Sequence, residues 1–419
     1  MIDLSNVTAI ALGADDVLEI QDSLGTVLWQ KIIYYTVNIS AGSNGTVSVN
    51  GVSGNYSQSV PSGTVLTIQG TGDTGYDFDQ WSDGNTDNPR TITVTGNLTL
   101  TAAFESVVTD EYFWIENISG SSMTVTIKKN NKSAPTITVY KSSDQTTWTS
   151  MGTTSTTGIT ATVSAGRKMY FKCTAAKWAG SNLYRNLISA NQNHNVGGNI
   201  MSLLYDDNYQ NYSTVYSYAF STLFATDSYL INTSKLKLPA TTIGDYCYHN
   251  MFKDCTSLTT SPVILPATSV NTNSYYGMFQ GCTALTTAPE LPATTVQSYS
   301  CANMFNGCTS LTTSPALPAT TLDKNSYYGM FQGCTSLTTA PELPATTLTQ
   351  SCYSSMFSGC SSLNRVTTYA NDISANSCVY NWLQNVSAQG DFFNLGNPAP
   401  TYPSGVSGIP QGWTEHTSL

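Results

Sequence analysis

The chain is poor in charge. Its 419 residues include 16 Lys and Arg and 26 Asp and Glu, and charged residues make up only 10% of it, against roughly 25% in ordinary globular proteins. The formal net charge is −10. Nucleic-acid binding depends on clustered Lys and Arg, so this balance excludes a phosphate-binding surface spread over the molecule. The best basic cluster, Lys128, Lys129 and Lys132, flanks two asparagines and is interpreted as a solvated hairpin tip.

Export and membrane signals are missing from the sequence. The chain opens with Met-Ile-Asp-Leu-Ser-Asn instead of a basic stretch and an apolar core. No run approaches the roughly 18 consecutive apolar residues of a membrane helix. We therefore expect a protein that is made in the cytoplasm and is not inserted into a membrane. Its ten cysteines are then expected to be reduced thiols.

Groups for catalysis and metal binding are scarce. The three histidines, His194, His249 and His416, stand in unrelated contexts. The cysteines lack the closely spaced pairs of a zinc site, and the acidic groups at 15–16 and 206–207 lack the alternating ligands of an EF-hand loop. No nucleophile, phosphate-binding or dinucleotide motif is visible. The sequence predicts that the protein is not an enzyme and has neither metal nor cofactor.

A repeat dominates the second half of the chain. Met-Phe pairs recur every 26 or 27 residues, each followed by a Cys and a Leu at fixed distances, and they begin at Met251, Met278, Met304, Met330 and Met356. A constant period with apolar residues in register predicts stacked units that bury these positions against one another, as in a solenoid. Within one unit, residues 336–344 are expected to form a strand and residues 326–334 a short helix that ends at Gly333.

The repeat cysteines keep the same register as the Met-Phe pairs and are expected to be small buried thiols. They are Cys255, Cys282, Cys308, Cys334 and Cys360. These units resemble BspA-like leucine-rich repeats, which carry Phe-x-x-Cys-x-x-Leu at similar spacing in surface proteins of gut bacteria and their phages. The resemblance covers about residues 200–390 and implies an α/β solenoid, with residues 391–419 as a C-terminal cap or tail.

Alternating apolar and polar residues upstream predict small β modules. In residues 34–106, the run from Gly75 to Gly84 and the segment 98–104 resemble the divergent internalin B-repeat module. In that family Trp81 would be a core residue, and the module would be a surface-displayed spacer. Residues 107–199 are expected to form a β-sandwich.

The first 33 residues stand apart, and strands at 17–21 and 26–30 are expected to form a hairpin. This opening resembles the N-terminal segments of phage tail-fibre and head-fibre proteins, which dock the fibre onto the virion. The resemblance assigns docking to Leu18, Ile20, Val27 and Trp29. The predicted fold class is therefore multidomain, with all-β N-terminal modules (hairpin, internalin-repeat-like domain and β-sandwich) followed by a leucine-rich-repeat α/β solenoid.

Tyrosine is abundant, with 25 residues. A tyrosine has an apolar body and a polar tip, which suits sugar rings, but the tyrosines where the solenoid begins are better explained as a cap over its open apolar end. The Tyr-Tyr pair at 275–276 recurs at 327–328, which predicts an aromatic stripe marking every second unit. The candidate residues for binding a glycan or host surface are Tyr205, Tyr209, Tyr212, Tyr275, Tyr276, Tyr327 and Tyr328.

Together these features predict a phage virion protein, made in the host cytoplasm and displayed as a head or tail fibre or decoration. Its expected partners are other virion proteins at the N-terminus and host glycans at the solenoid, and a homo-oligomer is expected. A bacterial surface adhesin with a trimmed export signal is the main alternative, and Met1 at the start of the chain favours the phage protein over it. A glycan hydrolase is a third possibility that lacks a visible carboxylate pair.

Overall fold

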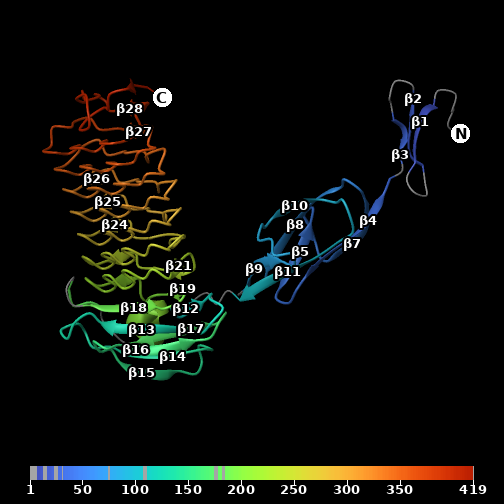
Figure 1. Ribbon diagram of the computed structural model, residues 1–419, viewed down its shortest axis with the longest axis horizontal. Helices are drawn as coiled ribbons and strands as arrows, with labels where there is room; N and C mark the ends of the chain where they lie inside the picture. Colours follow the sequence, from blue (N-terminus) through green and yellow to red (C-terminus); the bar gives the residue numbers. More distant parts are fainter. Residues whose placement is uncertain are drawn as a thin grey trace. The chain divides into compact units, whose positions relative to one another are not determined.

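The chain forms two compact units, Met1–Thr109 and Asp110–Leu419, which are described separately (Figure 1). In the computed structural model, most described residues lie in short strands and turns. The one α-helix among them, α1, spans Ser202–Tyr205, and the 3-10 helix η1 follows at Asp206–Asn211. The protein is therefore multidomain and essentially all-β. The structure describes residues 7–12, 17–22, 27–30, 32–73, 76–106, 111–173, 178–181 and 185–418, and the side chains of the first 31 residues fall outside this description.

The first three strands of the N-terminal unit form an antiparallel sheet in the order β1–β2–β3. β2 (Val17–Asp22) and β3 (Val27–Gln30) are the expected antiparallel pair. The sequence did not indicate β1 (Val7–Leu12), which adds a third strand to the sheet. The residues assigned to docking, Leu18, Ile20, Val27 and Trp29, lie outside the described side chains, so their role stays a prediction.

Two four-stranded sheets make up the rest of the N-terminal unit, in the orders β10–β8–β5–β6 and β7–β4–β11–β9. The strands are β4 (Tyr34–Ala41), β5 (Gly45–Val49), β6 (Val52–Ser53), β7 (Tyr56–Pro61), β8 (Val65–Gly72), β9 (Tyr76–Trp81), β10 (Arg90–Thr93) and β11 (Leu98–Ser106). Alternate side chains of β8 are buried and share a core with Trp81. The Trp81 side chain is completely buried, and its indole N–H donates to the backbone oxygen of Asp87 at 3.0 Å. Trp81 is a core residue, as predicted.

The second unit begins with two sheets that share one core, the arrangement of a sandwich. One sheet has the order β15–β14–β17–β12–β19–β21, with β22 also paired to β19, and the other β16–β13–β18. Their strands are β12 (Trp114–Asn117), β13 (Met123–Lys129), β14 (Thr138–Ser142), β15 (Thr149–Thr153), β16 (Ile159–Val163), β17 (Lys168–Cys173), β18 (Asn186–Ala190), β19 (His194–Asn199), β21 (Leu230–Asn232) and β22 (Leu236–Lys237). We refer to this part as the base.

Above the base, the repeats form coils that stack in parallel, and each coil is one 26- or 27-residue repeat (Figure 1). Short strands at equivalent positions pair from coil to coil, for example Val296 beside Val270. These strands are β20 (Thr214–Val215), β23 (Thr242–Ile243), β24 (Ser269–Val270), β25 (Thr295–Val296), β26 (Thr321–Leu322), β27 (Arg365–Thr368), β28 (Gly390–Asn394) and β29 (Trp413–His416). β29 and all of β28 except Gly390 belong to residues 391–419, the segment expected to be a cap or tail, and both strands continue the parallel stacking.

The helix expected at residues 326–334 does not form. The backbone makes a row of turns in which alternate N–H groups bind inside the coil, as from Met330 to the oxygen of Tyr327 (3.2 Å). The N–H groups between them bind the next coil, as from Phe331 to the oxygen of Met356 (2.9 Å). Every fourth residue has positive φ, at Asn325, Gly329 and Gly333, which an α-helix does not allow. The coils are therefore built from turns and strands, and the expected α/β character is corrected to all-β.

The interior of the stack repeats from coil to coil. The rings of Phe224, Phe252, Phe279, Phe305, Phe331 and Phe357 stack with centroids 5.3–5.7 Å apart and planes within 11° of parallel. Each repeat thiol donates to the carbonyl oxygen of the Phe in the preceding coil, as from Cys308 to Phe279 at 3.1 Å. All ten cysteines are buried and unpaired, as predicted for the repeat thiols.

One hydrophobic core runs through the whole second unit, from Phe113 in the base to Trp413 in the last strand. β21 and β22 explain this continuity, because both belong to the first coils and both pair in parallel with β19 of the base. The base therefore covers the apolar end of the coil stack directly.

Candidate functional site: the tyrosine edge of the coil stack

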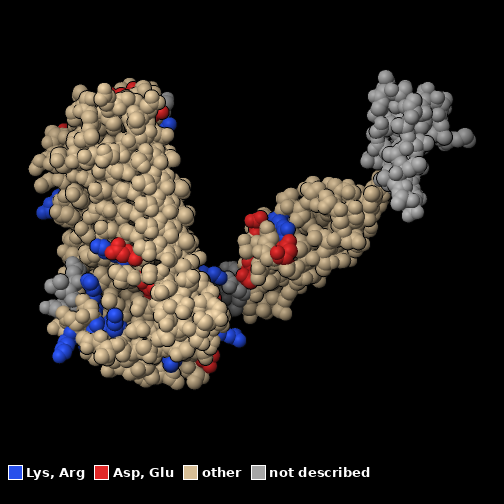
Figure 2. All heavy atoms as spheres, in the orientation of Figure 1, with Lys and Arg blue, Asp and Glu red and all other residues tan. Residues whose placement is uncertain are grey.

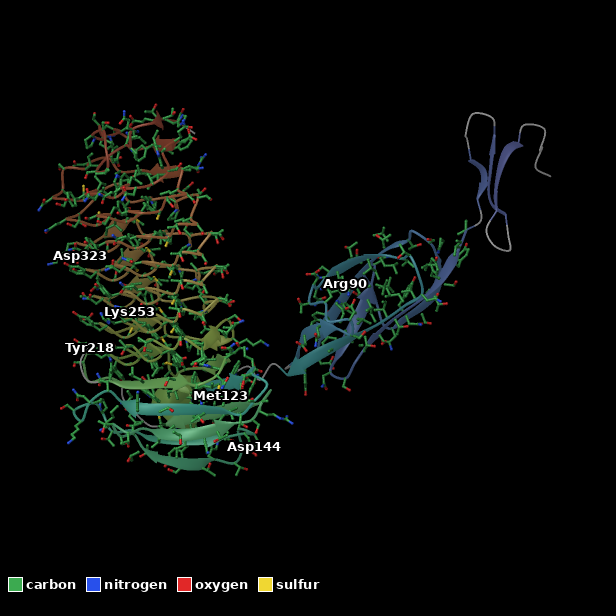
Figure 3. All side chains as sticks on the ribbon, in the orientation of Figure 1. Arg90, Met123, Asp144, Tyr218, Lys253 and Asp323 are labelled. Atoms are coloured by element: carbon green, nitrogen blue, oxygen red, sulfur yellow. The ribbon has the colours of Figure 1, made fainter. Side chains whose placement is uncertain are left out.

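The row of turns places two sequence positions of successive coils on one side of the stack. Counted from the repeat Met or its equivalent, these positions lie five and two residues earlier. We call the aromatic side chains found there the tyrosine edge: Tyr218, Tyr246, His249, Tyr276, Tyr299, Tyr328 and Tyr380. All are half-buried or exposed. Figure 3 shows Tyr218 on this side of the stack, with Lys253 and Asp323 from later turn rows.

The first part of the tyrosine edge is a ladder of touching rings. Tyr218 and Tyr246 stack with centroids 4.9 Å apart, and Tyr246 lies 5.6 Å from His249. His249 in turn stacks on Tyr276 of the next coil at 5.0 Å and 7°. Burial, then the cations of Arg185 and Lys253, lowers the pKa of His249 to about 4. The imidazole is therefore neutral at neutral pH and packs as an aromatic ring.

Amide side chains continue the ladder beyond Tyr276. Asn303 donates its amide N–H to the Tyr276 hydroxyl at 3.1 Å, and the Asn306 amide donates to Asn303 Oδ1 at 3.2 Å. Asn306 also donates to Gln332 Oε1 of the following coil at 3.0 Å. These bonds order the polar side chains along the edge, next to the aromatic rings.

Two kinds of coil alternate over four successive repeats of the stack. The residue before the repeat Met is Asn250, then Gly277, then Asn303, then Gly329. A Cβ on Gly277 would lie 2.2 Å from Asn250 Oδ1, and one on Gly329 would lie 2.5 Å from Asn303 Oδ1. Glycine in every second coil therefore makes room for the amide of the preceding coil.

The expected Tyr-Tyr pairs divide between the inside and the outside of the stack. Tyr275 and Tyr327 are only 1% and 2% exposed and stack on interior tyrosines, so their assignment as binding residues is corrected. Tyr276 is half-buried and Tyr328 is 36% exposed. Buried residues of the turn row come in adjacent pairs, such as Ser274 with Tyr275 and Ser326 with Tyr327, which leaves only the second tyrosine of each Tyr-Tyr pair at the surface.

The candidate binding tyrosines at the start of the coil stack, Tyr205, Tyr209 and Tyr212, do not belong to the tyrosine edge. Tyr209 is 1% exposed and packs against Tyr112 of the base at 4.8 Å, so it is corrected from a binding residue to a core residue at the junction. Tyr205 and Tyr212 stack face to face at 3.8 Å, and the Tyr205 hydroxyl donates to the backbone oxygen of Thr214. Tyr212 is exposed but lies outside the tyrosine edge.

An ionic cluster joins the base to η1. The Lys172 ammonium of β17 lies 3.0 Å from Asp206 Oδ1, binds Asp207, and lies 4.7 Å from the centre of the Trp148 ring. Tyr112 donates its hydroxyl to Asp207 at 2.6 Å. These two adjacent carboxylates are therefore held by a cation and a phenol, as in a structural ion network.

Sequence reasoning missed Tyr218, Tyr246, Tyr299 and His249 as edge residues. The available signal was the register, since Tyr246 and Tyr299 both stand five residues before a repeat Met. Tyr380 was missed for a related reason, because its coil has Trp382 in place of Met. The edge combines aromatic rings, hydroxyls and amides, which is a chemistry for binding neutral polar ligands.

Metal-binding groups are not clustered in the described part of the chain, where no three His, Cys, Asp or Glu residues converge. The described helices include none that is long and apolar enough to cross a membrane.

One family model matches the chain: the divergent InlB B-repeat domain, over residues 35–108. The match covers the two four-stranded sheets around Trp81 and confirms the resemblance seen in the sequence. No curated protein and no solved structure matches the chain.

Proposed function

We propose that the protein is a phage virion protein that is displayed on the head or tail and attaches the particle to glycans of the host surface. In this proposal the coil stack is a BspA-like leucine-rich-repeat array in which turns replace the short helices. The B-repeat domain is the spacer that presents the array. The protein is made in the host cytoplasm and assembles onto the virion without catalysing a reaction.

The tyrosine edge is the observation that supports attachment. It offers half-buried aromatic rings and ordered amides on successive coils, with Tyr328 36% and Tyr380 55% exposed. Few charged side chains appear on the face of the coil stack seen in Figure 2. Recognition at such a surface depends on stacking and hydrogen bonding more than on ion pairs.

The N-terminal sheet is the proposed docking element, and Leu18, Ile20, Val27 and Trp29 are the residues assigned to contact with other virion proteins. Several copies on one particle, as a homo-oligomer or as a multicopy decoration, would convert weak contacts into firm adsorption through effective concentration.

An exported bacterial surface adhesin is the second candidate function, because the matched B-repeat domain suits a surface spacer on a cell as well as on a particle. Labelled antibodies against residues 200–419, viewed by electron microscopy on purified particles and on cells, separate the two. Label on cells that carry no phage would favour the adhesin.

The attachment proposal is tested by displaying the full chain on beads and measuring their adsorption to host cells. The double variant Tyr276→Ala/Tyr328→Ala should adsorb several-fold less, whereas Tyr216→Ala, which removes an exposed tyrosine outside the edge, should behave as the wild type. Equal adsorption of the wild type and the double variant would contradict a role for the edge.

A further inference from the structure

One of the two positions of the tyrosine edge has a period of two coils from Tyr276 onward. The position two residues before the repeat Met, or before Trp382 in the last of these coils, holds Tyr276, Tyr328 and Tyr380, which are spaced 52 residues apart. The two coils between them have small residues there, Ala302 and Ser354, which are buried. From Tyr276 to Tyr380, half-buried or exposed rings therefore alternate with small buried side chains at this position.

The distance between these tyrosines is set by the stacking of the coils. Neighbouring strands lie about 4.7–4.9 Å apart, so tyrosines two coils apart are separated by about 10 Å along the stack. The same two-coil period holds Asn303 against Gly329 and Asn250 against Gly277. The spacing is thus fixed by backbone pairing and does not depend on flexible side chains.

A linear glycan with β-1,4 linkages has a matching period. One sugar unit of such an extended chain has nearly the length of one strand spacing. Successive sugars are turned over by half a rotation, so the same ring face recurs at every second sugar. A tyrosine at every second coil would therefore meet the same face of every second sugar along one chain.

The polar groups of the edge fit a neutral chain. The position two residues after the repeat Met holds Lys253 in the first Met-containing coil and uncharged side chains in the coils that follow: Gln280, Asn306, Gln332 and Ser358. Asn306 and Asn303 are already linked to Tyr276 and Gln332 by hydrogen bonds that run along the stack. Amides and phenol hydroxyls offer donors and acceptors to the hydroxyls of a sugar chain and carry no charge that would pair with a charged polymer.

We infer that the tyrosine edge binds a linear, extended, neutral β-1,4-linked polysaccharide that runs along the coil stack, with Tyr276, Tyr328 and Tyr380 under alternate sugars. This inference rests on the proposed attachment function and names the class of glycan. The three tyrosines span about five sugars, because each step of about 10 Å covers two of them.

The experiment is calorimetric titration of the full chain with oligosaccharides of one to eight sugars. Three extended β-1,4 series are used, made of glucose, xylose or N-acetylglucosamine, with α-1,4-linked glucose oligomers as the curved control. In at least one β series the affinity should rise at least about tenfold between two and five sugars and then level off, since each aromatic contact contributes roughly 0.5–1.5 kcal/mol. The α series should bind at least about tenfold more weakly at six sugars.

Variants locate the binding. Tyr328→Ala should weaken six-sugar binding about three- to tenfold and hardly change two-sugar binding, while Tyr216→Ala should leave both unchanged. No binding in any β series, equal affinity for the α series, or affinity independent of length would overturn the inference. The bead adsorption assay tests the attachment function separately. If adsorption depends on the tyrosine edge but the calorimetric titrations show no effect of sugar-chain length or linkage, the attachment function stands and only this inference is refuted.

Discussion

Acidification should destabilise the second unit through His249. This side chain lies between Tyr246 and Tyr276, with Arg185 and Lys253 near enough to disfavour a positive charge. Burial lowers its pKa to about 4, whereas an unfolded His has a pKa of about 6.5. The unfolded chain therefore takes up a proton below pH 6.5 that the folded chain takes up only near pH 4. Stability from this group is complete above pH 6.5 and is lost as the pH falls toward 4.

The size of the effect follows from the same two pKa values. The loss should be about 2 kcal/mol at pH 5 and about 3 kcal/mol once the pH is below 4. Unfolding of the wild type by urea, followed by tyrosine fluorescence between pH 7.5 and 4.5, measures it. His249→Tyr, which installs the residue found at this position in three other coils, and His249→Gln should both remove this component of the pH dependence. Parallel pH curves for the wild type and both variants would refute the reasoning.

Two further perturbations test the packing of the second unit. A thiol reagent should label the native protein slowly, because burial raises the pKa of Cys308 to about 12, and should label all ten cysteines after denaturation. Cys308→Ala should lower the free energy of unfolding by about 1–2 kcal/mol. Rapid labelling of the native wild-type protein would contradict the burial of the repeat thiols. Lys172→Met leaves Asp206 and Asp207 without their cation. It should lower the free energy of unfolding measured in urea by about 1–3 kcal/mol. A loss below about 0.5 kcal/mol would show that the ionic cluster is unimportant for stability.

The sequence was informative where periodicity decides the structure. The fixed register of Met330, Phe331 and Cys334 with their counterparts predicted a common interior, and these residues are fully buried. Alternation in β8 and the run from Gly75 to Gly84, which contains Trp81, likewise pointed to the B-repeat domain. In each case the apolar pattern alone selects which side chains leave water.

The sequence was misleading where backbone conformation decides. A short apolar run ended by glycine looks like a helix, but Asn325, Gly329 and Gly333 at intervals of four residues permit a row of turns with positive φ. That geometry also determines which tyrosine of a pair faces outward, so Tyr275 and Tyr276 could not be told apart before the turns were known. The pairing of β21 and β22 with β19 involves strands of two or three residues, too short to leave a pattern.

The alternation of Asn and Gly beside the repeat Met constrains how an array of this kind can change its length. Gene duplication that inserts or removes two coils preserves every contact between Asn303 and Gly329 and between their counterparts. Removal of the single coil that contains Gly277 would bring the coil of Asn250 against that of Asn303, whose Cβ would occupy the space the Asn250 amide now uses. Recombination should therefore yield arrays that grow and shrink in steps of 52 residues.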